Sequence, residues 1–187
     1  MADTGSDDAQ VPEYSYVVDV ASLPATGIER PIRPTDAEMA AVAERLGLQA
    51  IDRFDIRIAV RPWRGSGARM TCSFEADVVQ TCVVTLEPVP ATVRDEFEVT
   101  FLPAKMIEAP KPGQEIDVSP DEDAPEPLGG ETGTSFDAGD ITVQYLSLAL
   151  DPYPRKAGAA IPEEATTPEE PSPFAALAAL KPNGKDQ

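Results

Sequence analysis

Side chains that could carry out catalysis are scarce in this sequence of 187 residues. It contains no histidine, so the usual neutral-pH base of serine and cysteine nucleophiles is missing. No segment matches a nucleophile elbow or a glycine loop that binds phosphate. Carboxylates are abundant between residues 108 and 140, but the surrounding prolines and glycines predict a flexible segment that cannot hold two of them at a catalytic distance. We therefore expect no enzymatic activity. An enzyme such as a nuclease or a redox protein is a further hypothesis, beside the two binding roles described below.

The two cysteines, Cys72 and Cys82, are the residues most able to bind a metal or take part in redox chemistry. A metal site needs more ligands than two cysteines supply. Asp121, Glu122 and Asp123 lack the glycine and the terminal glutamate of an EF-hand loop. In a reducing compartment, thiols most often pack as small apolar groups. We expect no metal and no cofactor, with a redox or metal role of the cysteines as the alternative.

Arginines concentrate between residues 28 and 69, where eight of them oppose six acidic residues. Alternation predicts a strand from residue 51. Its solvent side and its end carry four arginines and one aromatic residue: Arg53, Arg57, Arg61, Trp63 and Arg64. Such a face can bind phosphate, a stacked base or an acidic protein surface. The alternative is an ordinary solvated sheet face crossed by arginine–aspartate pairs.

The overall charge favours a different kind of partner. Lysine and arginine number 15 against 33 acidic residues, which gives a formal charge of −18 and a pI near 4.2. Attraction of the whole surface to nucleic acid or anionic lipid is therefore disfavoured, and basic proteins fit better. The first residues lack the basic and apolar regions of a signal peptide, and no apolar stretch is long enough to cross a bilayer. We expect a cytoplasmic protein without a membrane partner.

The regular elements that would position these residues follow from periodicity. We expect a disordered leader over residues 1–13 and a first strand over residues 14–20, followed by irregular chain to residue 34. Thr35 and Glu38 form a capping box, and the helix after them has one apolar face, made of Met39, Val42, Ala43 and Leu46.

Strand patterns dominate the next fifty residues. Period-two alternation places Phe54, Ile56, Ile58 and Val60 on one side, and a flexible turn over residues 64–67 leads into a second alternating set, Met70, Cys72, Phe74, Ala76 and Val78. A third strand over residues 79–86 and a fourth that ends near residue 103 extend the pattern. We predict an α+β fold with an antiparallel sheet of about four to six strands and two helices, in one domain over residues 14–150.

The last third of the chain alternates between acidic, proline-rich segments and apolar ones. We expect a long acidic loop over residues 104–136 and a disordered linker over residues 151–172. Between them, a helix capped by the 137–140 segment has a stripe made of Ile141, Tyr145, Leu148 and Ala149, although residues 141–143 also suit a strand. A short tail helix over residues 173–181 is predicted to dock on its own sheet or to act as a tethered recognition peptide.

Three stretches together resemble the YceD family, described as large ribosomal RNA subunit accumulation proteins. They are residues 77–89, 136–150 and 172–181, the last reading Ser-Pro-Phe-Ala-Ala-Leu-Ala-Ala-Leu-Lys. The positions that match the family motifs are Cys82, Asp137, Asp140, Leu148, Leu150, Pro173, Phe174, Leu177 and Leu180. Val79 stands where the family commonly has the first cysteine of a Cys-x-x-Cys pair, which argues against metal binding or dithiol chemistry at this motif.

The resemblance implies a non-enzymatic role in the accumulation or processing of large-subunit (23S) ribosomal RNA, within ribosome biogenesis. Because the protein is strongly acidic, we favour an adaptor that binds a basic ribosomal protein or assembly factor and so acts on the RNA indirectly. Direct binding of the RNA by the arginine-rich sheet face is the alternative.

Overall fold

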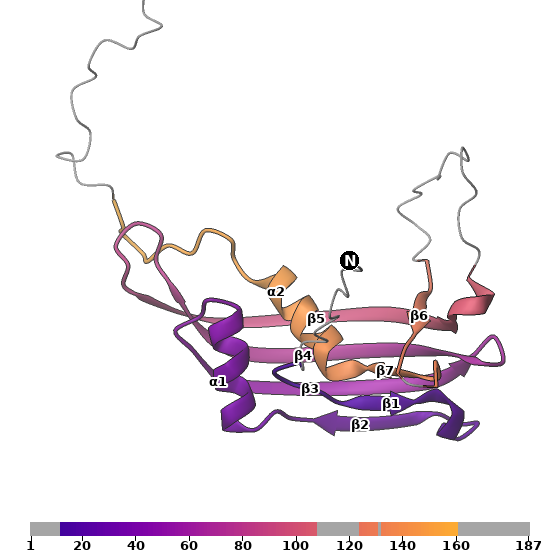
Figure 1. Cartoon of the computed structure of the whole chain (residues 1–187). Helices are drawn as coiled ribbons and strands as arrows, with labels where there is room; N and C mark the ends of the chain where they lie inside the picture. Colours follow the sequence, from indigo (N-terminus) through magenta and orange to yellow (C-terminus); the bar gives the residue numbers. More distant parts are fainter. Residues whose placement is uncertain (1–11, 108–123, 131, 161–187) are drawn as a thin grey trace, which may run out of the picture.

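The computed structural model describes residues 12–107, 124–130 and 132–160 and has an α+β architecture (Figure 1). Its main sheet contains five strands in the spatial order β2–β3–β4–β5–β6. They are β2 (Ile28–Ile32), β3 (Ala50–Trp63), β4 (Gly67–Thr81), β5 (Pro88–Pro103) and β6 (Glu126–Leu128). Neighbouring strands are antiparallel, except that β5 and β6 run parallel. The predicted α+β class, with an antiparallel sheet core and two helices, is confirmed.

The remaining elements lie on one side of this sheet (Figure 1). A two-stranded sheet pairs β1 (Val17–Asp19) with β7 (Ser135–Asp137). The α-helices are α1 (Asp36–Arg45) and α2 (Ala138–Ala149), and single 3-10 turns, η1 (Val20–Ser22) and η2 (Ala104–Met106), follow β1 and β5. Within the described residues, the opposite face of the main sheet is left to solvent.

The hydrophobic core lies between the main sheet and the helices. The predicted inward residues of β3 are all buried, and so are those of β4, which pairs with β3 from Gly67 to Val79. Val42 from α1 and Leu146 from α2 are fully buried against this layer. The alternation in the sequence therefore identifies the covered face correctly, because successive strand side chains point to opposite sides.

The first helix begins where the capping box predicts. The hydroxyl of Thr35 accepts a hydrogen bond from the Glu38 backbone, and the Glu38 carboxylate accepts one from the Thr35 backbone at 2.7 Å. Val42 and Ala43 are buried, and Met39 and Leu46 pack partly against the core. The prediction of this helix and its face is confirmed.

The second helix is confirmed, and its most buried residues are not those of the predicted stripe. Its buried residues are Ala138, Gly139, Thr142, Val143 and Leu146. Of the predicted stripe, Ile141, Tyr145 and Ala149 pack partly against the core, whereas Leu148 is 79% exposed. Gly139, at the start of α2, lies close to the backbone of Ser15 and Tyr16, a contact that periodicity does not reveal.

Two expectations for the strands are wrong. The segment 23–34, expected to be irregular, contains β2, which accepts Pro31 because an edge strand does not need every N–H group for pairing. Residues 79–86 do not form a separate strand: β4 continues to Thr81, and a turn follows in which Leu86 has a positive φ of 60°. A separate strand over residues 79–86 is wrong because residues 79–81 belong to β4, which is 15 residues long.

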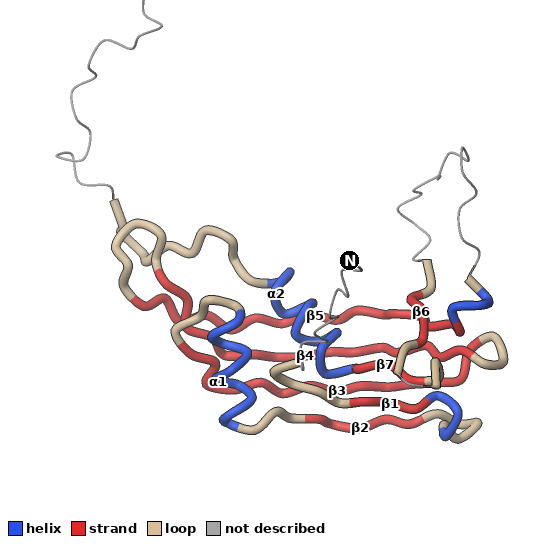
Figure 2. Tube along the Cα trace, in the orientation of Figure 1, coloured by secondary structure: helices blue, strands red, loops and turns tan. Residues whose placement is uncertain are grey.

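The acidic and proline-rich segments contain more structure than expected (Figure 2). The predicted loop over residues 104–136 includes β6, which pairs with β5, and part of β7. The first ten residues of the predicted linker pack beside the turn between β4 and β5, where the Val83 N–H donates to the Pro154 carbonyl at 2.9 Å. The predicted first strand shortens to β1 and continues as η1. Residues 161–172, the tail helix at 173–181 and residues 1–11 of the leader lie outside the described residues.

Neither of the two α-helices in the described ranges has the length and apolar character needed to cross a membrane.

Candidate functional site

The outer face of the main sheet holds the arginines that the sequence singles out. Arg53, Arg57 and Arg61 are opposed across β4 by Asp77, Ser73 and Arg69 in turn. The buried residues of β3 alternate with these positions, so the three arginines point away from the helices. The structure therefore confirms their common face and adds their cross-strand partners.

Arg53 is surrounded by carboxylates. Its Nε lies 2.8 Å from Asp77 Oδ2, its Nη1 lies 3.0 Å from Asp55 Oδ2, and its Nη2 pairs with Glu75. The hydrogen bonds that Arg53 donates, to Asp77 first and then to Glu75 and Asp55, raise the pKa of Arg53 above its ordinary value. The charge of Arg53 is thus balanced within the sheet face.

The same network extends to the neighbouring strands on both sides. Arg33, just beyond β2, pairs with Asp55, and the Nε of Arg94 on β5 lies 2.5 Å from Glu75 Oε2. Hydrogen bonds from Arg94 and then Arg53 lower the pKa of Glu75 to about 2. The members of this paired cluster are three arginines (Arg33, Arg53, Arg94) and three carboxylates (Asp55, Glu75, Asp77), so their formal charges sum to zero.

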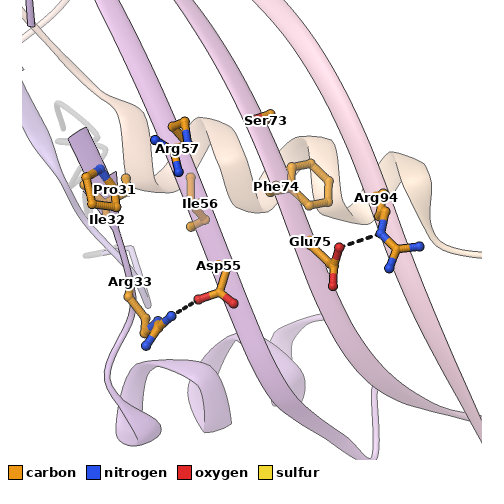
Figure 3. Close-up of a pocket in the computed structure, with 10 residues that line it drawn as sticks. All are labelled: Pro31, Ile32, Arg33, Asp55, Ile56, Arg57, Ser73, Phe74, Glu75 and Arg94. Atoms are coloured by element: carbon orange, nitrogen blue, oxygen red, sulfur yellow. Dashed lines mark hydrogen bonds and ion pairs between the residues drawn. The ribbon is translucent and has the colours of Figure 1, made fainter. Parts of the chain in front are cut away.

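A shallow hollow of about 800 Å³ lies over part of this cluster (Figure 3). Figure 3 shows Arg33 and Asp55 pointing toward each other, and Glu75 and Arg94 doing the same. Arg57 is the arginine of the hollow with the loosest partner, since its Nη1 is 3.8 Å from Glu29 Oε1 and both side chains are well exposed. Two of the three arginines that line the hollow, Arg33 and Arg94, are paired with carboxylates, so the hollow offers little free positive charge.

Positive charge with fewer partners gathers at the other end of the face. Arg61 and Arg69 are direct cross-strand neighbours, and Trp63 ends β3 beside them. The guanidinium of Arg64 lies 4.3 Å from the centre of the Trp63 ring, and that of Arg69 lies 5.8 Å away. Among the ion pairs of the described residues, none involves Arg61 or Arg64, and Arg69 has only a 3.4 Å contact with Glu98.

Reading β3 alone misses half of this site. Arg69, Arg94 and the carboxylates of β4 belong to neighbouring strands, and Arg33 lies just beyond β2. The signal that could have found them is the polar set at the outward positions of β4, where Arg69, Glu75 and Asp77 alternate with buried residues. Assigning these residues to one site requires the register in which the strands pair, and the sequence alone does not give it.

Cys82 has a defined structural environment. It is fully buried, and its sulfur accepts hydrogen bonds from the backbone N–H groups of Thr85 and Lys156, both at 3.4 Å. These bonds, that of Lys156 first, lower the pKa of Cys82 to about 6. Lys156 also pairs with Glu87 at 2.8 Å. Cys82 thus joins the turn after β4 to the chain that follows α2.

The other family-motif positions in the described ranges have structural contacts or lie at the surface. Asp137 caps α2 by accepting from the Gly139 and Asp140 backbones, and it also accepts from the Tyr16 backbone at 2.8 Å. Asp140 lies 3.3 Å from Arg45. Leu150 packs partly against the core, whereas Leu148 is exposed. The positions in the tail, Pro173, Phe174, Leu177 and Leu180, lie outside the described residues.

The described ranges contain no group of three or more potential metal ligands. Cys72 is buried beneath α2, its sulfur lies 3.6 Å from the Thr142 hydroxyl, and burial raises its pKa to about 11.

No protein-family model, curated protein or solved structure matches the chain. The outer face of the main sheet therefore offers two kinds of surface for binding. One is the paired cluster around Arg53, and the other is the group of less paired arginines around Trp63.

Proposed function

We propose that this chain is a non-enzymatic factor that supports the accumulation or processing of 23S ribosomal RNA during ribosome biogenesis. Within that role, it binds a basic ribosomal protein or assembly factor. The role in RNA accumulation rests on the resemblance of three sequence stretches to the YceD family. The choice of a protein partner rests on the physical character of the sheet face.

The observation that carries this choice is the charge balance around Arg53. The three arginines of the paired cluster already contact three carboxylates. An approaching phosphate would have to displace these partners or add its charge to theirs, and the chain as a whole carries −18. A basic protein segment meets the opposite situation, because the long-range field attracts it.

A second candidate, direct RNA binding, is favoured by one feature. Arg61, Trp63 and Arg64 form a compact basic and aromatic group in which the two arginines have no carboxylate partner among the described residues. Arginine and an aromatic ring at this spacing can bind a phosphate and a stacked base. This alternative places RNA at the hairpin end of the face, away from Arg53.

Crosslinking in cells separates the two candidates. The tagged full-length chain is crosslinked, purified under denaturing conditions, and its bound RNA and proteins are identified. Our proposal predicts a basic large-subunit ribosomal protein or assembly factor as the main adduct, with reduced 23S RNA in cells depleted of the chain. Large-subunit RNA crosslinked to residues 61–64, without such a protein, would overturn the adaptor and establish the alternative.

Charge reversal provides the matched control. The double variant Arg61→Glu with Arg64→Glu changes charge by the same amount as Arg30→Glu with Arg155→Glu, at residues that are also exposed. The adaptor hypothesis predicts equal recovery of the protein adduct from both double variants. Loss of crosslinked RNA from the first double variant alone would support direct binding.

A further inference from the structure

Among the residues that the structure describes, one long strand edge of the main sheet lacks a neighbour over most of its length. β5 has 16 residues and pairs with β4 from Pro88 to Phe101. On its other side it pairs with β6 only over Phe101–Pro103. Within the described residues, the rest of this edge presents backbone N–H and C=O groups that no strand uses. Such an edge is a template for another strand.

A groove lies where this open edge meets β6, next to Val99 and Phe101, and is walled by α2. It has a volume of about 860 Å³, and its apolar lining includes Val99 of β5, Pro127 of β6 and three α2 residues, Ile141, Tyr145 and Leu148. Tyr145 stacks on Phe97 of β5, which fixes the helix next to the strand. Ile141 and Tyr145 pack partly against the core as well as lining the groove, and Leu148 is 79% exposed. A segment added to β5 would place alternate side chains on these three residues.

The other side of an added strand would face carboxylates. Glu96 and Glu98 point to the outer face of β5, opposite Ser73 and Thr71 of β4, and both are exposed. The charged residues that line the groove are also acidic: Glu126, Asp137 and Asp140. Cross-strand pairs of opposite charge stabilise a sheet, and pairs of like charge oppose it. The edge therefore suits a segment in which apolar residues alternate with lysine or arginine.

A second copy of this chain fits the same edge poorly. Antiparallel pairing of two β5 strands centred on Glu96 would bring the two Glu96 carboxylates opposite each other within a segment that has three acidic residues, Asp95, Glu96 and Glu98, and one basic residue, Arg94. Asp95 lies opposite the buried Phe74, so it points to the helix side, where an inward charge discourages self-association of an edge strand. The charge pattern selects a basic partner and disfavours a homodimer.

We infer that the open edge of β5 and the groove beside α2 bind an extended, basic and apolar segment of a partner protein by strand addition. The kind of partner rests on the proposed function, and the position rests on the groove. The segment's backbone would pair with β5, its apolar side chains would contact Tyr145 and Leu148, and its basic side chains would lie next to Glu96 and Glu98.

A labelled decapeptide of alternating lysine and valine tests this site on the full-length chain, with a glutamate–valine decapeptide as the control probe. We expect binding of the lysine peptide only, with slower hydrogen exchange at the backbone amides of β5. Leu148→Ser should weaken binding about tenfold, as expected for loss of a buried leucine contact. Leu86→Ser, at a residue 75% exposed in the turn before β5, should change it less than about twofold.

A second pair of matched variants tests how much the acidic residues of β5 contribute to binding of the lysine peptide. Glu96→Lys should weaken binding of the lysine peptide several-fold more than Glu44→Lys, which makes the same charge change at an exposed position of α1. Absence of binding, equal binding of the glutamate peptide, equal loss in each matched pair, or protection away from β5 would overturn the groove assignment.

Failure of this site and failure of the proposed function are distinguishable. If a basic ribosomal protein crosslinks in cells while the lysine peptide leaves β5 unprotected, the function stands and the groove assignment is wrong. If the peptide protects β5 but only RNA crosslinks in cells, the groove stands as a peptide site and the proposed function is wrong.

Discussion

The ring of Tyr145 in α2 lies parallel to the ring of Phe97 in β5, with their centroids 3.6 Å apart and their planes at 2°. Phe97 is 8% exposed, so this contact covers the strand near the open edge of the sheet. It also orients α2 such that Ile141 and Leu148 line the groove next to β5. One aromatic pair thus belongs both to the core and to the wall of the proposed binding site.

A double-mutant cycle measures this contact. Phe97→Ala and Tyr145→Ala should each lower the free energy of unfolding by about 2 to 4 kcal/mol, because each removes a large apolar group from a packed position. The double variant should be about 1 kcal/mol less destabilised than the sum, as expected for an aromatic pair. Urea unfolding provides the measurement. Full additivity would show that the two rings do not interact energetically.

The carboxylates around Arg53 predict a specific acid sensitivity. The pKa of Glu75 falls from an ordinary 4.5 to about 2 in the folded protein, because Arg94 and Arg53 bind its charged form. A carboxylate with a depressed folded-state pKa stabilises the fold above its unfolded pKa and loses that contribution as pH falls through the folded value. Stability should therefore decline between about pH 4.5 and pH 2.

Glu75→Gln tests the assignment. Its free energy of unfolding should depend less on pH over this interval than that of the original chain, as followed by urea unfolding at each pH. Glu29→Gln is the control, because Glu29 has a single ion pair of 3.8 Å with an exposed arginine. Equal pH dependence in the Glu75→Gln variant and the original chain would contradict the paired network.

The thiol of Cys82 should make the stability of the fold depend on pH in the neutral to basic range. Its pKa falls from 9.0 to about 6, since the backbone of Lys156 and then Thr85 donate to the sulfur. Between these values the unfolded chain holds a proton that the native state has lost, so stability should rise from about pH 6 to pH 9. Cys82→Ser should remove most of this rise in urea unfolding.

The thiolate can also be observed directly. Titration of its ultraviolet absorbance in the Cys72→Ala variant should give a midpoint near pH 6 for the remaining cysteine. The companion variant, Cys82→Ala, should titrate near pH 11 because Cys72 is buried away from donors strong enough to offset desolvation. A midpoint near 9 in the Cys72→Ala variant would show that the backbone donors do not hold the sulfur in solution.

Local patterns in the sequence predict the elements whose signals are local. The capping box at Thr35 and the alternation in β3 and β4 give the first helix and the covered face of the sheet correctly. β2 escapes this reasoning because it has five residues and contains Pro31, and only its position at the sheet edge makes that acceptable.

The site is less predictable because its energetics depend on register. Arg53 meets Asp77 and Glu75, which are more than twenty residues away and come into contact only through the hairpin pairing of β3 with β4. A register shift lies between Ile51 and Arg53, so counting along the strands does not predict these partners. The sequence shows an arginine-rich face, whereas the pairing shows that Arg53 is balanced by carboxylates and that, among the described residues, Arg61 and Arg64 are not.

The packing of α2 against the chain before β1 is the clearest case of a long-range contact, and Gly139 tests it. A Cβ atom at Gly139 would lie 2.7 Å from the Tyr16 nitrogen, closer than real contacts allow, and 3.0 Å from the Ser15 backbone. In an isolated helix, Gly→Ala stabilises by about 1 kcal/mol. Here we expect Gly139→Ala to lower the free energy of unfolding instead, because backbone atoms on both sides must move apart.

The same clash should also affect the hydrogen bond that Asp137 accepts from the Tyr16 backbone at 2.8 Å, since the chain before β1 must shift away from α2. We therefore expect faster hydrogen exchange at Tyr16 in the Gly139→Ala variant, together with the loss of stability in urea. Ser147→Ala is the matched control, at an exposed position of the same helix, and should stabilise by a few tenths of a kcal/mol through helix propensity alone. If Gly139→Ala stabilised the chain as Ser147→Ala does, the close approach of α2 to residues 15–16 would be contradicted.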